Sequence, residues 1–135
     1  MAKKIFIIDD DAILRLIIKK MVLKIDNSLS CHQCENGEVG LKELELIKNS
    51  EDRVIVLLDI NMPILDGWGF LDRLEECNAY NIKLLDLYIL SSSTDESDKL
   101  KASQYKVVKK FFHKPLNNVD LIEVLKGGLP IQKAG

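Results

Sequence analysis

The chain alternates between two hydrophobic patterns along most of its length, and this alternation limits the folds that it can adopt. Short apolar runs rich in β-branched residues occur at residues 4–8, 54–58 and 87–90, with weaker runs at 29–34 and 107–112. Each run is followed by a segment with apolar residues at helical spacing, at residues 12–25, 37–48, 67–77, 94–103 and 117–126. The pattern therefore predicts five strands, each followed by a helix. The second strand and the fourth helix have the weakest patterns.

This order of elements predicts one α/β domain. Parallel strands need helical crossovers and are buried on both faces, so apolar strands that alternate with amphipathic helices indicate a doubly wound sheet. We expect a five-stranded parallel sheet with helices on both faces. The length of 135 residues, with 47% hydrophobic and 30% charged residues, fits a single domain with a well-filled core.

Composition argues against several classes of function. The formal net charge of −2 gives no overall electrostatic attraction to nucleic acid or to an anionic membrane. The first apolar run has only four or five residues before three aspartates, which is too short for a signal peptide or a spanning helix. The three cysteines, an odd number, argue for reduced thiols. We expect a cytoplasmic protein with no membrane or nucleic-acid partner.

Cys31 and Cys34 form a CxxC motif with His32 between them, and such a motif can bind zinc or do redox chemistry. A structural zinc site needs further ligands, and the motif falls in a predicted strand. We therefore interpret these cysteines as packing residues.

Residues suited to chemistry follow four of the five apolar runs. In chain order they are Asp9, Asp10, Asp11, Asp59, Ser91 and Lys114. Ligands of open α/β sheets bind beyond the carboxyl ends of the strands. We expect these side chains to meet at that edge of the sheet.

Carboxylates gathered at one edge repel one another unless a cation neutralises them. Mg²⁺ suits such a site because it takes oxygen ligands, often one or two carboxylates together with phosphoryl oxygens. We predict Asp10 and Asp59 as direct ligands, Asp9 as a ligand through water, and the backbone carbonyl of Asn61 as a further ligand. The predicted cofactor is therefore Mg²⁺.

Lys114 and the Ser91 hydroxyl complete a set that suits phosphoryl transfer. Charge on the oxygens of a transferred phosphoryl group must be met by positioned donors, and these two residues can supply them. Asp59 is then the predicted nucleophile, since a carboxylate can accept a phosphoryl group as an acyl phosphate.

The motifs around these residues resemble the receiver domains of two-component response regulators. The matching segments are IIDDD, LLDINMPILDGWGFL, ILSS and FFHKPL. The resemblance extends from Lys4 to about Gly127 and implies the flavodoxin-like strand order 2-1-3-4-5, for which the chemotaxis receiver is a standard example. It also implies that a sensor histidine kinase or a histidine phosphotransfer protein donates the phosphoryl group.

The resemblance implies a role for each residue of the set. It makes Asp59 the phosphoacceptor, Asp9 and Asp10 the acidic pair, Asn61 the carbonyl ligand, Ser91 the hydroxyl residue, Lys114 the lysine and Phe111 the aromatic switch residue. Three features depart from the common pattern. Ser91 replaces the more frequent Thr, Phe111 lacks the hydroxyl of the Tyr often found there, and Asp11 adds a third acid.

Single residues of the set also have ordinary structural explanations. Asp10 or Asp11 could be the N-cap of the helix that begins near residue 12. Ser93 and Glu96 have the spacing of a capping box. Only the convergence of reactive residues from four strand ends favours the functional interpretation.

The C-terminal end predicts how such a protein would act. Residues 1–128 form the predicted receiver domain and residues 129–135 a short tail, too short for an output domain. The protein would then act on a separate downstream protein, which the sequence does not identify, or pass its phosphoryl group on in a phosphorelay.

Two other classes of function compete with this interpretation. A phosphohydrolase of the haloacid-dehalogenase type would use Asp9 as nucleophile and Asp11 as acid, but Ile13 stands where that pattern has Thr and Asp59 would have no role. A receiver-like adaptor would bind a partner without being phosphorylated. The complete set of reactive residues gives no reason to prefer the adaptor.

Overall fold

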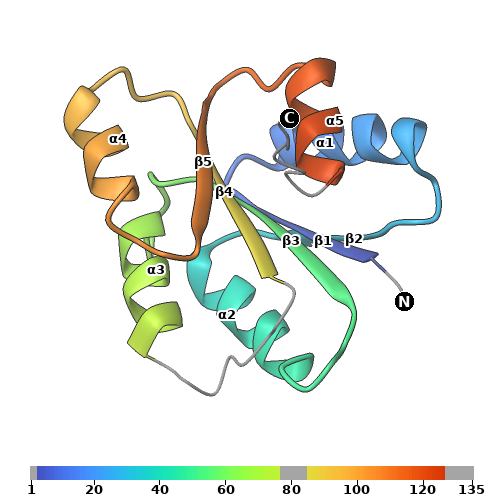
Figure 1. The fold of residues 1–135 in the computed structure, drawn as a ribbon, viewed down its shortest axis with the longest axis horizontal. Helices are drawn as coiled ribbons and strands as arrows, with labels where there is room; N and C mark the ends of the chain where they lie inside the picture. Colours follow the sequence, from blue (N-terminus) through green and yellow to red (C-terminus); the bar gives the residue numbers. More distant parts are fainter. Residues whose placement is uncertain (1–2, 77–84, 127–135) are drawn as a thin grey trace, which may run out of the picture.

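The structure of the protein, a computed structural model, describes residues 3–76 and 85–126 (Figure 1). Its strands are β1 Lys3–Ile8, β2 Ser30–Cys34, β3 Arg53–Leu58, β4 Leu85–Ser91 and β5 Val108–His113. Its helices are α1 Ala12–Ile25, α2 Gly37–Leu46, α3 Gly67–Glu76, α4 Glu96–Ala102 and α5 Asn118–Leu125. Every predicted strand and helix is present, and the predicted tail lies outside the described residues.

The strands form one parallel sheet in the order β2-β1-β3-β4-β5. This confirms the predicted fold class and strand order, including the weakly patterned second strand. That strand is short and half exposed because it lies at the sheet edge and pairs with β1 alone. Edge strands have few apolar residues for this reason, so their sequence pattern is weak.

Helices cover both faces of the sheet (Figure 1). On one face, α1 and α5 pack against a cluster that includes Ile7, Val22 and Leu121. On the other face, α2, α3 and α4 pack against a cluster that includes Ile8 and Phe70. Neighbouring residues of β1 thus enter opposite cores, as the alternation of side chains along a strand requires.

The same alternation separates the two cysteines of the CxxC motif. Cys34 belongs to the cluster beneath α2 and α3, whereas Cys31 packs against the cluster beneath α1 and α5. Burial raises the pKa of Cys34 to about 12 and also raises the pKa of Cys31. Two thiols on opposite faces of a sheet cannot bind one ion, which agrees with the packing interpretation. Cys77 lies outside the described residues.

The start of α4 differs from the predicted capping box. The helix begins at Glu96, its N-cap is Asp95, and the Asp95 carboxylate accepts a hydrogen bond from the backbone N–H of Ser97 at 3.0 Å. Ser93 instead donates its hydroxyl to the Asp98 carboxylate at 2.6 Å. The capping-box prediction was wrong because the helix starts two residues later than its pattern indicated. Within the described residues, no helix is long and apolar enough to cross a membrane.

Candidate functional site

Hydrogen bonds between neighbouring strand ends bring the predicted residues to one edge of the sheet. Three such backbone bonds link successive ends, and all run from an amide to a carbonyl. They join Asp9 to Cys34 at 3.0 Å, Asp59 to Ile8 at 2.9 Å, and Lys114 to Ser91 at 2.8 Å. Asp9, Asp59 and Lys114 are therefore the first residues beyond their strands, as the sequence predicted. Asp10 is the second residue beyond β1, and Ser91 is the last residue within β4.

Asp9, Asp10 and Asp59 form the acidic cluster of the site. One carboxylate oxygen from each lies within 4.8 Å of the others. Asp9 and Asp59 are buried, whereas Asp10 is exposed. Asp11 lies outside this cluster, because its carboxylate caps α1 by accepting hydrogen bonds from the first-turn amides of Ile13 and Leu14. The third acid thus has the structural role that the sequence left open.

Lys114 supplies a positive charge to the buried carboxylates. Its Nζ donates a hydrogen bond to Asp9 Oδ2 at 2.9 Å and lies 3.6 Å from Asp59 Oδ1. The other oxygen of Asp9, Oδ1, accepts a hydrogen bond from the Asp11 backbone N–H at 2.9 Å. The bond between Lys114 and Pro115 is cis.

The electrostatics of the site disfavour a negative charge on Asp59. Burial and the neighbouring Asp9 raise its pKa from 3.8 to about 6, although Lys114 and a hydrogen bond from the Asn61 backbone N–H act in the opposite direction. Burial lowers the pKa of Lys114, but its contacts with Asp9 and Asp59 outweigh this and raise the pKa overall. One lysine does not fully compensate two buried carboxylates.

The excess of negative charge, two buried carboxylates against one lysine, suits the binding of a metal ion. A divalent cation would compensate the remaining negative charge, and Mg²⁺ prefers the carboxylate and carbonyl oxygens present here. The donor set therefore fits Mg²⁺. Asn61 lies beside the cluster, since its N–H donates to Asp59, and the use of its carbonyl as a ligand stays a prediction.

Ser91 and Phe111 lie on the side of the site formed by β4 and β5. Ser91 is completely buried, and its Oγ accepts a hydrogen bond from the Ser93 backbone N–H at 3.0 Å. Phe111 is half-buried and lines a small cavity of about 230 Å³, together with Thr94 and His113. Space for a movement of the Phe111 ring is thus present next to the strand end that carries Ser91.

The sequence analysis missed two residues that support the site. The Arg15 guanidinium donates to the backbone carbonyl of Asp9 and, at 3.2 Å, to the side chain of Gln33. Gly67 packs so closely that an added Cβ would lie 2.7 Å from the Asp59 carbonyl oxygen. No local pattern marks these contacts, because they depend on how β2 and α3 sit beside the acidic strand ends.

Comparison with known proteins agrees with this fold and gives the family of the chain. Residues 5–126 match the response regulator receiver domain family. A protein-glutamate methylesterase/protein-glutamine glutaminase of Syntrophomonas wolfei is 31% identical over 121 residues, which cover 88% of this chain and 32% of that protein. Another of Carboxydothermus hydrogenoformans is 34% identical over 89 residues, which cover 66% of this chain and 24% of that protein.

A solved structure of a response regulator receiver protein from Dyadobacter fermentans has a TM-score of 0.82. It is 23% identical, and the match covers 96% of this chain and all of that one. By contrast, the chain spans only about a quarter to a third of the length of the two curated relatives. The chain belongs to the response regulator receiver domain family of two-component signalling.

Proposed function

We propose that Asp59 accepts a phosphoryl group from the phosphohistidine of a sensor histidine kinase or of a histidine phosphotransfer protein. The observation that carries this proposal is the placement of Asp59, a buried carboxylate beside two other aspartates and 3.6 Å from the Lys114 ammonium. A carboxylate oxygen of Asp59 attacks the phosphorus, the bond from phosphorus to the histidine nitrogen breaks, and an acyl phosphate forms.

Asp9, Asp10, Asp59 and the Asn61 carbonyl would hold Mg²⁺. When bound, the ion neutralises the acidic cluster and the charge of the phosphoryl oxygens. The pKa of Asp59 is raised, so the site without an ion disfavours the charged carboxylate. Asp59 must be ionised to act as a nucleophile, and a bound cation would favour the ionised form, which supports this part of the proposal.

Lys114 and Ser91 would contact the phosphoryl group once it is on Asp59. Lys114 already lies between Asp9 and Asp59, so a small movement of its ammonium reaches a new oxygen on Asp59. Ser91 would give up the hydrogen bond that its Oγ accepts from Ser93 and donate its hydroxyl to the phosphoryl oxygen. These two donors meet the equatorial charge of the transferred group.

Phe111 would report this change at the surface. Movement of Ser91 towards Asp59 opens space along β4, and Phe111 turns into it from the cavity that it now lines. The surface of α4, β5 and α5 then differs between the two states and is read by a downstream protein.

The exposed face of α1 offers a docking surface for the phosphodonor. Ile13, Leu16 and Ile17 are large, exposed and apolar, and they follow the acidic cluster directly along the chain. Exposed apolar residues that lie together are typical of protein interaction sites. We propose that they place the donor histidine near Asp59.

The proposal includes a cytoplasmic location for the receiver domain. The free thiols of Cys31 and Cys34 fit a reducing compartment. Membership of the receiver family favours a signalling domain over the haloacid-dehalogenase alternative, and the Asp11 carboxylate, the acid of that alternative, caps a helix instead.

Incubation with acetyl phosphate and Mg²⁺, followed by mass spectrometry of peptides, tests the proposal. We expect one phosphoryl group on Asp59, lost in Asp59→Asn and kept in Asp11→Asn. Label on Asp9, or sustained hydrolysis of small phosphate esters, would support the phosphohydrolase. Absence of label in the folded protein would support the unphosphorylated adaptor.

A further inference from the structure

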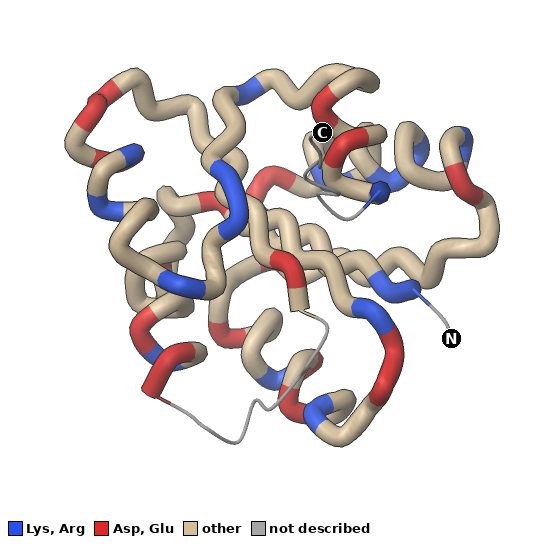
Figure 2. The backbone as a smooth tube through the Cα atoms, viewed as in Figure 1, with Lys and Arg blue, Asp and Glu red and all other residues tan. Residues whose placement is uncertain are grey.

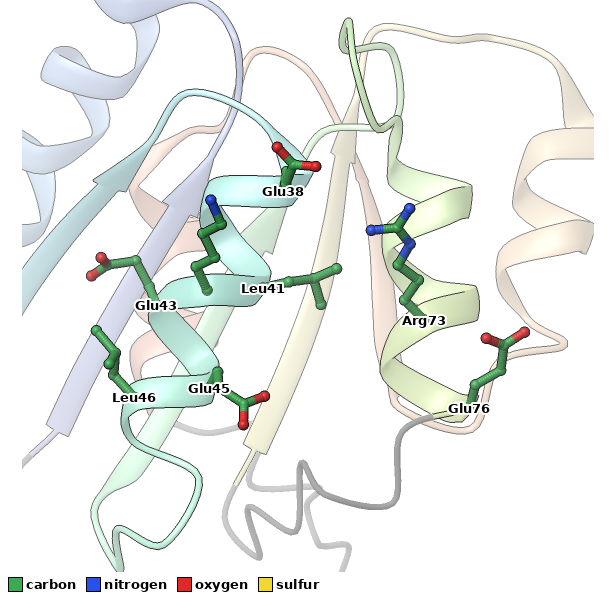
Figure 3. A pocket seen from close by; sticks show the side chains of 8 residues that line it. Glu38, Leu41, Glu43, Glu45, Leu46, Arg73 and Glu76 are labelled. Atoms are coloured by element: carbon green, nitrogen blue, oxygen red, sulfur yellow. The ribbon is translucent and has the colours of Figure 1, made fainter.

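A groove of about 970 Å³ lies along α2 and α3, on the face of the sheet opposite α1 and α5 (Figure 3). Its buried residue is Leu41, which points from α2 towards α3. Among the residues that the structure describes, its lining comes from α2 and α3 and includes none of the residues of the proposed phosphorylation site.

Close packing near the start of α2 fixes the position of this helix. An added Cβ on Gly40 would lie 2.6 Å from Ile8 Cδ1 and 3.3 Å from Phe70 Cε2. Gly40 therefore lets α2 contact both the sheet and α3. Further along, the two helices line the groove with long side chains such as Glu45 and Arg73. The helices that line the groove are thus held in place by the packing at Gly40.

Leu46, the last residue of α2, provides an apolar anchor at one end of the groove. It is 79% exposed, the largest value among the exposed large hydrophobic residues of the described chain. Its exposed side chain and the buried Leu41 lie five residues apart along the same helix. Figure 3 shows Leu46 on the other side of α2 from Leu41, so a partner that contacts both must lie across the end of α2. An exposed leucine is a typical contact for a partner's apolar residue.

The charges along the groove indicate a basic partner. Carboxylates lie in the last turns of both helices, at Glu43 and Glu45 in α2 and at Glu76 in α3, where Arg73 is also present. Helix C-termini carry a partial negative charge and favour cations, yet α2 has no basic residue in its last turn. Figure 2 shows acidic residues along α2 and where α3 ends.

Two cations also line the groove, but they leave an acidic excess. Lys42 and Arg73 lie among four glutamates, including Glu38 at the start of α2. Beyond the groove, Lys48 forms an ion pair with Glu45 at 2.8 Å. Because Lys48 compensates Glu45, the acidic excess of the groove lies with Glu38, Glu43 and Glu76.

We propose that the α2–α3 groove docks a basic amphipathic helix of a partner protein. Apolar residues of that helix contact Leu41 and Leu46, and its lysines or arginines pair with the carboxylates at the ends of α2 and α3. The groove shares no residue with the acidic cluster, so the partner binds equally before and after phosphorylation. The receiver would then stay bound to this partner through α2 and α3 while its other surfaces bind the phosphodonor and the downstream protein in turn.

A titration monitored by backbone amide NMR tests this proposal. The probe is a helical peptide of about 18 residues, or five turns, built from leucine on one face and lysine on the other. A second peptide has glutamate in place of every lysine. We expect saturable binding of the lysine peptide with shifts in α2 and α3, and at least about tenfold weaker binding of the glutamate peptide. Binding should weaken several-fold in about 0.5 M salt, where charges are screened.

Matched variants separate this site from general attraction to an acidic protein. Leu46→Ala should weaken the lysine peptide at least about fivefold, whereas Leu100→Ala, which removes an exposed leucine of α4, should not. Likewise Glu76→Gln should weaken binding and Glu96→Gln should not. The amide spectra also show whether each variant is folded.

Three results would overturn the proposal. These are shifts confined to α1 or α5, equal affinity for the two peptides, and unchanged affinity in Leu46→Ala. A change in affinity of more than about fivefold after acetyl phosphate treatment would overturn the independence from phosphorylation. Failure of Asp59 to be phosphorylated would leave the groove's binding unaffected, so the two proposals fail separately.

Discussion

Lys114 is held more closely by Asp9 than by Asp59, since its Nζ lies 2.9 Å from Asp9 Oδ2 and 3.6 Å from Asp59 Oδ1. The lysine thus compensates one buried carboxylate through a hydrogen bond and the other through its charge alone. Burial and the neighbouring Asp9 therefore keep the pKa of Asp59 raised in spite of the lysine. A further cation would reduce the repulsion between these carboxylates.

Replacement of Lys114 by alanine should destabilise the metal-free protein. Two buried carboxylates would lose their cation, and we expect a loss of about 1–3 kcal/mol in the free energy of unfolding. Urea denaturation at pH 8 with a chelator measures it. Lys110→Ala is the control, because Lys110 pairs with Glu123 at the surface and such pairs contribute less than about 1 kcal/mol. Equal losses in the two variants would contradict the charge argument.

Asp59→Asn should make the metal-free protein more stable at neutral pH but not at acid pH. The folded-state pKa of Asp59, about 6, lies above its ordinary value of 3.8, so the protonated carboxyl favours folding. That stabilisation is complete below pH 3.8 and is lost as the pH rises through about 6. The shift sets an upper limit of about 3 kcal/mol, and solvent near the site reduces this to about 1–3 kcal/mol.

Urea denaturation of both proteins from pH 4 to pH 8 with a chelator measures this difference, and the comparison cancels the titration of other groups. We expect a difference that grows between pH 4 and pH 7. A difference that does not change with pH would show that Asp59 has an ordinary pKa in the folded protein.

The fold could be predicted from the sequence because its three central strands are largely apolar and most of its helices are amphipathic. An apolar run indicates a strand that is buried on both faces, and helical spacing of apolar residues indicates a helix that is buried on one face. The α/β fold requires both kinds of burial. The site could be predicted because strand ends of a parallel sheet share an edge, which brings residues as distant in sequence as Asp9 and Lys114 together.

The contacts that depend on side-chain packing could not be predicted. The sequence offered Asp10 and Asp11 equally as caps of α1, and only the path of the backbone made Asp11 the cap and left Asp10 in the acidic cluster. The cap of α4 was misassigned for a related reason, since four hydroxyl residues precede that helix and local spacing does not select among them.

Asp10→Asn and Asp11→Asn should differ in their effect on Mg²⁺ binding. Asp10 contributes an oxygen to the cluster, so its loss should weaken Mg²⁺ binding at least about tenfold, the size of effect typical of losing metal-site residues. Asp11 caps α1, and asparagine is an equally good N-cap, so Asp11→Asn should leave Mg²⁺ affinity nearly unchanged. Titration calorimetry measures both affinities. Similar losses in the two variants would indicate a general charge effect.

Ile64→Gly should stabilise the protein. Ile64 has a φ of 71°, in the left-handed region that disfavours β-branched residues, and its side chain is 78% exposed, so little burial is lost. We expect a gain of about 1 kcal/mol in the free energy of unfolding. Val119→Gly is the control, since Val119 is 74% exposed within α5, where glycine should instead destabilise by about 0.5 kcal/mol. A loss of stability in Ile64→Gly would mean that the backbone at Ile64 is not strained in the wild-type protein.

Gly67→Ala should be the more damaging of two alanine substitutions at the start of α3. An added Cβ on Gly67 would lie 2.7 Å from both the Asp59 carbonyl oxygen and Ile60 Cα, and this backbone cannot move without displacing Asp59. Overpacking of this kind costs about 1–3 kcal/mol, and we also expect slower phosphorylation by acetyl phosphate. On Gly69 the Cβ would meet the end of the Leu65 side chain, at 2.6 Å, which can rotate away. Gly69→Ala should therefore be nearly neutral by urea denaturation, and equal losses would contradict a rigid contact between α3 and the Asp59 backbone.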